Sequence, residues 1–275
     1  MSCSTCTYNI NNRKEQCMYA IITGASSGIG KEMARCLLSR LDIVLVARSE
    51  DKLEKLEKEY NKLSKRHRYN HKVEYFVCDV SNVDECKALY EKYKSKDVHV
   101  LINGAGFGAL GEFDSISLDR EINMINTNVL GAHVLTKLFL KDMLKKNRGY
   151  ILNIASSAGY MPGSPYMATY YASKAYILNL TRAIAREKSV MESNVYVGAL
   201  CPGPVPTGFN EAAGIPREAK GMSPRKVAKY AIHKMYGNKE IILPGIAAKI
   251  TYVLRKFSPD EILLDFAGDW QEKKM

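Results

Sequence analysis

The sequence predicts an α/β fold in which a doubly wound parallel sheet of about seven strands carries helices on both faces. Short apolar runs rich in β-branched residues lack the polar alternation of half-exposed strands, which is typical of strands buried on both faces. Segments with helical spacing separate these runs, such as 51–65, where Leu53, Leu56 and Tyr60 recur between charges. We expect strands at 18–23, 42–47, 73–78, 98–102, 150–155, 195–200 and 240–242.

The chain is expected to fold as one domain over 17–245, because no repeat, low-complexity linker or break in composition divides it. Residues 1–16 are expected to form a flexible leader. The Pro- and Gly-rich segment 202–224 interrupts the strand–helix alternation, and a functional loop is expected over about 205–222. Residues 246–275 are expected to form an amphipathic extension packed on the same domain.

The composition excludes several classes of protein. With 46% hydrophobic and 25% charged residues, the 275 residues are ordinary for a soluble globular protein. No apolar run reaches the roughly 18–20 residues of a membrane span, and the N-terminus lacks a secretory signal. We therefore expect a cytoplasmic location. The net charge of +11 comes without a nucleic-acid-binding motif, so we interpret the basic clusters as solvated helix faces and ends.

The cysteine and histidine patterns predict no metal site. Cys3-x-x-Cys6 has no second cysteine pair, and the chain is neither short nor evidently secreted. His67 and His71 are four positions apart, but they lie in a stretch that reads as solvated. We expect the seven cysteines to be free thiols, with Cys3 and Cys6 in the leader.

A glycine-rich turn follows the first expected strand directly and runs into a helix. Its spacing is G-x-x-x-G-x-G, from Gly24 to Gly30. Glycine lets the backbone turn tightly and approach a pyrophosphate, and a helix N-terminus presents N–H donors and a positive dipole end to phosphates. The sequence therefore predicts a dinucleotide site that includes Gly24, Ser26, Ser27, Gly28, Ile29 and Gly30.

The choice of dinucleotide is read at the end of the second strand, where an acidic residue would bind the ribose 2′-hydroxyl of NAD. Here that strand ends in Ala47-Arg48-Ser49. An arginine can instead pair with a 2′-phosphate through charge-assisted hydrogen bonds. We therefore predict NADP(H), held in part by Arg48 and Ser49, with an ordinary surface arginine as the alternative.

A serine and a Tyr-x-x-x-Lys pair have a spacing that points to acid–base chemistry. Of four such Tyr/Lys pairs, only Tyr170/Lys174 has a hydroxyl residue, Ser157, thirteen positions before the tyrosine. Because residues four apart share a helix face, the Lys174 ammonium is expected to lower the pKa of Tyr170 toward the range for general acid–base catalysis. Ser156 lies fourteen positions before Tyr170, so we prefer Ser157 as the group that polarises a substrate oxygen. An incidental pair on a surface helix is the alternative.

With these segments in this order, the chain resembles the short-chain dehydrogenase/reductase family over about residues 17–245. The segment Thr23–Gly30 resembles the family's cofactor turn, and Cys78-Asp79-Val80 its adenine-contacting segment. Asn103-Gly104-Ala105-Gly106 resembles the N-N-A-G motif but departs from it at Gly104, which we expect to alter the local turn more than the chemistry. The resemblance implies cofactor contacts from Asp79, Val80, Asn103, Ala105 and Gly106.

The second half of the chain carries the resemblance to the family's catalytic residues. Asn128 matches an asparagine that fixes a water in the family's proton relay, and Ser157, Tyr170 and Lys174 match the catalytic Ser, Tyr and Lys. The resemblance implies hydride delivery to a ketone or aldehyde carbon while Tyr170 protonates the oxygen; the reverse reaction oxidises a secondary alcohol. A further segment resembles the one that holds the nicotinamide carboxamide, which implies contacts from Pro202, Gly203, Val205 and Thr207, in addition to Tyr170 and Lys174.

The substrate is expected to be bulky and hydrophobic. The apolar residues of 244–257 follow helical spacing between basic ones, and the extended C-terminus resembles a branch of the family that reduces hydroxysteroids and other lipid-like carbonyls. A lid over the ligand, a contact in the family's usual homodimer or homotetramer, or a weak contact with a membrane surface are alternatives for this helix. A non-catalytic NADP(H)-binding regulatory protein and an epimerase or dehydratase using the same site are the alternative functions.

Overall fold

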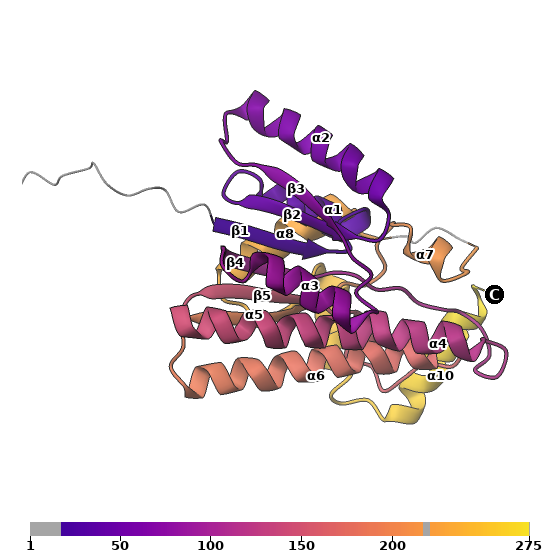
Figure 1. The fold of residues 1–275 in the computed structure, drawn as a ribbon. Helices are drawn as coiled ribbons and strands as arrows, with labels where there is room; N and C mark the ends of the chain where they lie inside the picture. Colours follow the sequence, from indigo (N-terminus) through magenta and orange to yellow (C-terminus); the bar gives the residue numbers. More distant parts are fainter. Residues whose placement is uncertain (1–17, 217–220, 275) are drawn as a thin grey trace, which may run out of the picture.

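The computed structural model describes residues 18–216 and 221–274, and its centre is a sheet in the order β3-β2-β1-β4-β5-β6-β7 (Figure 1). Neighbouring strands are all parallel within it. The predicted doubly wound fold is confirmed, and each expected strand is present with ends shifted by no more than one residue. The strands are β1 (Met18–Thr23), β2 (Asp42–Ala47), β3 (Val73–Val77), β4 (Asp97–Asn103), β5 (Gly149–Ile154), β6 (Val195–Leu200) and β7 (Ile241–Ile242).

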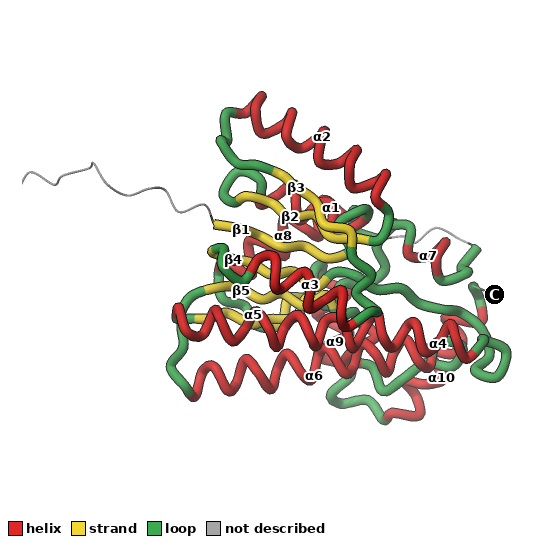
Figure 2. The backbone as a smooth tube through the Cα atoms, viewed as in Figure 1, coloured by secondary structure: helices red, strands yellow, loops and turns green. Residues whose placement is uncertain are grey.

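Helices cover both faces of this sheet, as Figures 1 and 2 show. Those connecting the strands are α1 (Gly28–Leu37), α2 (Glu50–His67), α3 (Val83–Tyr93), α4 (Leu118–Ile125), the π-helical turn η1 (Asn126–Gly131), α5 (Ala132–Lys146), the 3-10 turn η2 (Ser157–Tyr160), α6 (Ala168–Val190), α7 (Phe209–Ala212) and α8 (Pro224–Tyr236). After β7 follow α9 (Ile246–Leu254) and α10 (Asp260–Glu272).

Two apolar layers hold the helices to the sheet. On one face, α1, α2 and α8 bury residues such as Leu37 and Leu53 against β1, β2 and β6. On the other face, α3 and α5 bury Leu89 and Phe139 against the strands. Because β1, β2, β5 and β6 are covered on both sides, their sequences are almost continuously apolar, which is the pattern that identified them.

The strand order reverses between β1 and β4, since the chain leaves β1 toward β2 and β3 and later returns to β4 on the other side. In open α/β sheets the crevice at the carboxyl ends of such strands binds ligands. Here the turn after β1 and the turn after β4 meet at that edge: a Cβ placed on Gly24 would lie 2.7 Å from the carbonyl carbon of Gly104. The topology therefore brings the two glycine-rich segments together.

The C-terminal helices pack on the domain through small residues rather than through their apolar stripes. Ala248 of α9 and Ala267 of α10 are buried, and Tyr160 donates a hydrogen bond to the carbonyl of Ala248. The apolar side chains of α9 and of the turn after it are instead exposed: Ile246 is 75% exposed and Phe257 is 80% exposed. The exposed apolar side chains of this region are Ile246, Ile250, Val253, Leu254, Phe257, Ile262, Phe266 and Trp270.

Some expectations fall on residues outside those described. They include the leader 1–16 with Cys3 and Cys6, and residues 217–220 of the expected loop. Within the described part of the chain, no helix combines the length and apolar character that crossing a membrane requires.

Candidate active site

Backbone packing shapes the glycine-rich turn. Gly24 has φ +68°, and a Cβ on Gly30 would lie 2.5 Å from the carbonyl oxygen of Gly24, closer than any real Cβ contact. Gly28 has φ +55°, and its Cβ would lie 3.0 Å from Cγ2 of Thr207, which comes from the segment after β6. Gly24, Gly28 and Gly30 thus leave open a hollow, called the cradle below, that side chains at these positions would fill. Thr207 borders this cradle.

The first turn of α1 begins in this cradle. Ser27 is its N-cap, is exposed and makes no side-chain capping bond, so its hydroxyl and the first N–H groups of α1 are available to an anion. Ser26 and Ile29 are partly exposed beside it. The predicted residues at this end therefore fit the phosphates of a dinucleotide.

At the end of β2, Arg48 is exposed and close to one acid. Its side chain is 60% exposed, and Nη1 lies 3.7 Å from Oδ2 of Asp79. Asp79 uses its other oxygen to accept from the backbone N–H and the hydroxyl of Ser81, at 3.0 and 2.8 Å. Ser49 is the N-cap of α2 without a side-chain capping bond, and Val80 is buried behind Asp79. The Arg48 and Ser49 side chains are thus exposed at the end of β2, with Asp79 beside the guanidinium.

The segment after β4 is fixed to β1 by a side chain that the prediction did not single out. Thr23 Oγ1 accepts from the backbone N–H groups of Gly104 and Ala105, at 3.0 and 3.2 Å. A Cβ on Gly104 would lie 2.8 Å from the carbonyl oxygen of Thr23, so the two turns approach closely at this glycine. Asn103 is buried, and its amide donates to Asn153 Oδ1 at 2.8 Å. The Asn103 side chain is therefore engaged with β5 and α5 inside the domain.

The structure places Tyr170 and Lys174 on the first turns of α6, at the carboxyl end of β5. Lys174 is 6% exposed, its Nζ donates to the carbonyl of Ile154 at 3.0 Å, and it lies 5.9 Å from the Tyr170 ring centroid. Burial raises the pKa of Tyr170 to about 12 and lowers the pKa of Lys174 to about 8. The expected lowering of the Tyr170 pKa is therefore absent in this state, because desolvation of the phenol is the largest influence on it.

The serine that meets Tyr170 is Ser156. Its hydroxyl hydrogen-bonds the Tyr170 hydroxyl, which lowers the phenol pKa by less than burial raises it, and it also accepts from the N–H of Ala158 at 3.1 Å. Ser157 instead begins the 3-10 turn η2 and donates its backbone N–H to the carbonyl of Pro202 at 2.8 Å. The serine in contact with Tyr170 thus differs from the one that a count of thirteen positions favours, because residue spacing does not fix the path of the chain between η2 and α6.

Asn128 lies in the π-helical turn η1, between α4 and α5. Its amide donates to the carbonyl of Phe107 at 2.8 Å and to Ser173 Oγ at 3.1 Å, and its Oδ1 accepts from the N–H of Phe107 at 3.0 Å. A Cβ on Gly106 would lie 2.8 Å from Asn128 Oδ1 and 3.2 Å from Lys174 Nζ. The two predicted polar groups therefore meet at Gly106, and wide turns of this kind often mark functional sites.

The segment after β6 closes over Tyr170. The Phe209 ring centroid of α7 lies 5.2 Å from that of Tyr170. The carbonyl of Ala213 accepts from the N–H of Leu110 at 3.0 Å, and the Arg120 guanidinium donates to the carbonyl of Ala212. Of the other predicted contacts, Pro202 is buried, whereas Gly203 and Val205 are partly exposed. The part of this segment that the structure describes before residue 217 thus packs against Tyr170 at the carboxyl end of the sheet.

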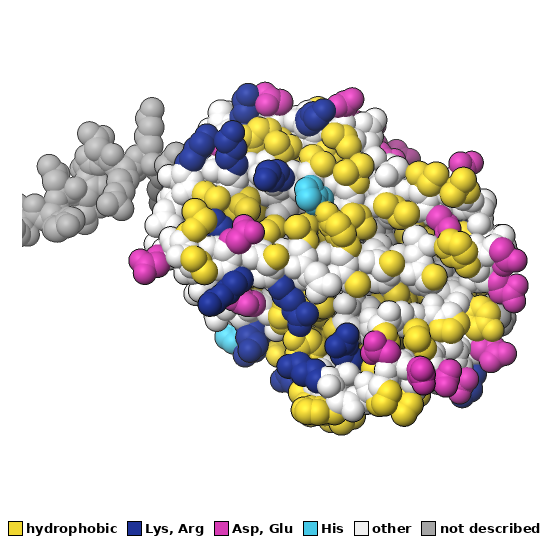
Figure 3. Space-filling model, turned by 90° about the horizontal axis from the view of Figure 1, so that it is seen from below, with side chains coloured by type: hydrophobic (Ala, Val, Ile, Leu, Met, Phe, Trp, Pro, Cys, Tyr) yellow, Lys and Arg dark blue, Asp and Glu magenta, His cyan; other side chains and the backbone are white. Residues whose placement is uncertain are grey.

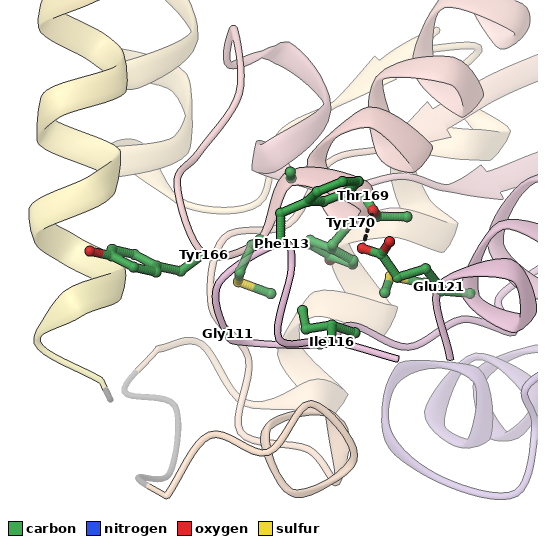
Figure 4. Close-up of a pocket in the computed structure, with 11 residues that line it drawn as sticks. Gly111, Phe113, Ile116, Glu121, Tyr166, Thr169 and Tyr170 are labelled. Carbon is green, nitrogen blue, oxygen red and sulfur yellow. Dashed lines mark hydrogen bonds between the residues drawn. The ribbon is translucent and has the colours of Figure 1, made fainter. Parts of the chain in front are cut away.

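A pocket of about 240 Å³, counted with its open mouth, borders Tyr170 (Figure 4). Its walls come from the segment before α4, from α4 and from the start of α6. The side chains are mainly apolar, but Glu121 and Thr169 meet inside it through a 2.6 Å hydrogen bond. Glu121 was not predicted, because one of two acidic residues in the first turns of a helix carries no pattern that marks a site. The lining consists of Ala109, Gly111, Phe113, Ile116, Glu121, Met124, Tyr166, Met167, Ala168, Thr169 and Tyr170.

Solved structures resemble this chain across most of its length. A short-chain dehydrogenase/reductase from Burkholderia phymatum in complex with NAD is 26% identical, with a TM-score of 0.78 over 90% of this chain and 95% of the other. A short-chain dehydrogenase from Sphingobium yanoikuyae in complex with NADPH is also 26% identical, with a TM-score of 0.76 over 88% and 93%. Both neighbours share the fold of this chain. The first contains NAD and the second contains NADPH.

Curated relatives differ in their described activity. Hydroxysteroid dehydrogenase-like protein 1 of Gallus gallus is 31% identical over 67% of this chain and 54% of its own length. The human protein named inactive hydroxysteroid dehydrogenase-like protein 1 is 28% identical over 86% and 69%. A very-long-chain 3-oxoacyl-CoA reductase of Neurospora crassa is 34% identical over 65% and 54%. The chain therefore spans about half the length of the first and third relatives.

The family model for short chain dehydrogenases matches residues 18–217, from β1 through the Tyr/Lys pair and into the closing loop. Both halves of the site lie within this range. The chain belongs to the short-chain dehydrogenase/reductase family of oxidoreductases.

Proposed function

We propose that this chain is an NADP(H)-dependent carbonyl reductase that also oxidises the corresponding secondary alcohol, with an apolar substrate. The observation that carries the proposal is the meeting of Tyr170, Ser156, Lys174 and Asn128 at the carboxyl end of the sheet, beside a cradle of glycines. These groups come from three separated segments, η1, the start of η2 and the first turns of α6, and have the residue types that proton transfer to a carbonyl oxygen needs.

The residues of the cofactor end fit a phosphorylated dinucleotide. Gly24, Gly28 and Gly30 leave room for backbone approach, and the N-terminus of α1 supplies N–H donors. Arg48 is exposed beside Ser49, with no acid in the strand-end position that would favour NAD. When bound, NADP(H) supplies the hydride and the protein supplies orientation and charge placement.

The protein residues manage the oxygen and its proton. Tyr170 and Ser156 would donate hydrogen bonds to the substrate carbonyl oxygen, and Tyr170 would give up its proton as the alkoxide forms. The raised pKa of the Tyr170 phenol, about 12, keeps that proton in place at neutral pH. Lys174 would stabilise the resulting phenolate, and Asn128 would hold the path by which water restores the proton.

The proposed location of the protein is the cytoplasm. The proposed substrate is a hydrophobic ketone or alcohol, of the hydroxysteroid or lipid-like kind. The pocket beside Tyr170 is lined mainly by apolar side chains, which supports this class. The exposed stripe of α9 and α10 supports a further proposal, a homodimer or homotetramer that covers these side chains.

The test is oxidation of NADPH and NADH at equal concentrations with steroid ketones, long-chain aldehydes and small diketones. Turnover should require NADPH, and Tyr170→Phe should reduce it at least about a hundredfold while NADPH binding persists. Tight NADPH binding without turnover of any compound would instead favour a regulatory NADP(H)-binding protein. This alternative is consistent with the name of the human relative, which is called inactive. Product formed without net NADPH consumption would favour an epimerase or dehydratase.

A further inference from the structure

The pocket beside Tyr170 contains one buried carboxylate that the catalytic groups do not use. Glu121 is 8% exposed, and it projects from α4 into a lining that otherwise includes Phe113, Ile116 and Met124. Figure 4 shows it pointing toward the first turn of α6, where Thr169 donates a 2.6 Å hydrogen bond to Oε1. An ionised group in such surroundings needs compensation, because burial of a charge is costly unless it is paired.

The compensation that the protein provides is incomplete. Within residues 18–216 and 221–274, no Lys, Arg or His nitrogen lies within 4.0 Å of the Glu121 carboxylate, which accepts its hydrogen bond from the Thr169 hydroxyl. The start of α6 adds a positive dipole end. A carboxylate has about four acceptor positions, so capacity for a further donor remains on the side that faces the pocket.

Three segments near the pocket, together called the acidic rim below, carry more acidic than basic side chains. The segment 111–121 leads into α4, α7 hydrogen-bonds the loop beside it, and α10 packs on the far side of 163–167, with Ser164 donating to the Ala267 carbonyl. Residues 111–121, 209–212 and 260–274 contain ten acidic and three basic side chains. Figure 3 shows acidic side chains gathered at this end of the molecule. Such a rim repels anionic substrates.

We propose that Glu121 binds a hydroxyl group on an otherwise apolar and uncharged carbonyl substrate and so selects for hydroxylated substrates. The hydroxyl would donate to the carboxylate at one end of the pocket, while the carbonyl lies against Tyr170 at the other. This inference rests on the proposed carbonyl chemistry of the same site. It separates the substrate from acyl thioesters of phosphate-bearing carriers, because those would bring several negative charges to an acidic rim.

The experiment compares androstanone with hydroxyandrostanone, a pair that differs by one hydroxyl on the ring farthest from the ketone. Both are measured with NADPH for kcat/KM and, by equilibrium dialysis, for binding to the NADPH-loaded protein. Wild type should favour the hydroxylated ketone by about tenfold to a hundredfold, the range expected for one hydrogen bond to a charged group. Glu121→Met should abolish that preference and leave kcat/KM for androstanone within about twofold of the wild-type value. Glu121→Gln keeps an acceptor and should therefore retain part of the preference.

Thr169→Val is the matched control, because it removes the internal donor but keeps the carboxylate. It should preserve the preference for the hydroxylated ketone. The inference is overturned if wild type treats both ketones alike, if every variant changes both equally, or if acetoacetyl-CoA is turned over faster than ethyl acetoacetate. Preferential binding of hydroxyandrostanone without turnover of either ketone would support the Glu121 inference while the proposed reductase function fails.

Discussion

The two ends of the site are built differently. At the cofactor end, the cradle depends on backbone: Gly24 and Gly30 are excluded from bearing a Cβ by carbonyl groups 2.5–2.7 Å away. At the substrate end, side chains from α4, α6 and α7 converge, such as Glu121 on Thr169 and Phe209 on Tyr170. Substitutions at the first end should therefore damage the fold together with binding, whereas those at the second should change chemistry and leave the fold intact.

Gly24→Ala should have the largest effect. Its φ of +68° costs a non-glycine residue about 1–2 kcal/mol, and the crowding against Gly104 should add about 1–3 kcal/mol. We expect the melting temperature to fall by roughly 5–10 °C and NADPH binding to be lost. The control is Gly237→Ala, where the Cβ would meet only ordinary contacts, the nearest at 3.5 Å. Equal melting temperatures for the two variants would contradict the backbone account of this end.

Ser156→Ala should lower kcat about a hundredfold, the range for loss of one hydrogen bond that acts in the transition state. The reason is the contact of its hydroxyl with Tyr170. Ser157→Ala is the matched control and should keep kcat within about threefold, because Ser157 bonds Pro202 through its backbone N–H, which alanine also has. Steady-state kinetics decide the matter, with thermal melts to show that both variants fold. A greater loss from Ser157→Ala would restore the spacing-based assignment.

Arg48→Ala should raise the KM for NADPH about tenfold and leave the KM for NADH unchanged, since only NADPH carries the 2′-phosphate. The effect is smaller than at the catalytic groups because the arginine is 60% exposed. Arg66→Ala, at an exposed position near the end of α2, is the control. If Arg48→Ala changes the KM values for NADPH and NADH equally, Arg48 acts through its contact with Asp79 rather than through a phosphate.

Lys174 should produce the smallest effect, seen in the pH dependence of stability. Burial lowers its pKa from 10.5 to about 8, so between these values the unfolded chain binds more protons and the free energy of unfolding rises with pH. Lys174→Met lacks this contribution. From pH 7.5 to 9.5, wild type should gain roughly 2–5 °C in melting temperature relative to the variant. Parallel melting curves across this range would show that Lys174 is not desolvated in the free protein.

The sequence by itself determined the sheet and the glycine-rich turn after its first strand. The strands of the buried sheet are continuous apolar runs, and the glycine-rich turn is a contiguous segment whose spacing reflects local backbone sterics. Tyr170 and Lys174 were found for the same reason, since residues four apart on one helix share a face.

Only the tertiary structure decided the side chains that meet across separate segments. Ser156 rather than Ser157 reaches Tyr170 because the chain path after β5 sets which hydroxyl points inward. The pairing of Glu121 with Thr169 joins residues 48 positions apart, and no local pattern marks it. The outward turn of the α9 stripe likewise depends on packing, because amphipathic spacing identifies an apolar face but not the surface against which it lies.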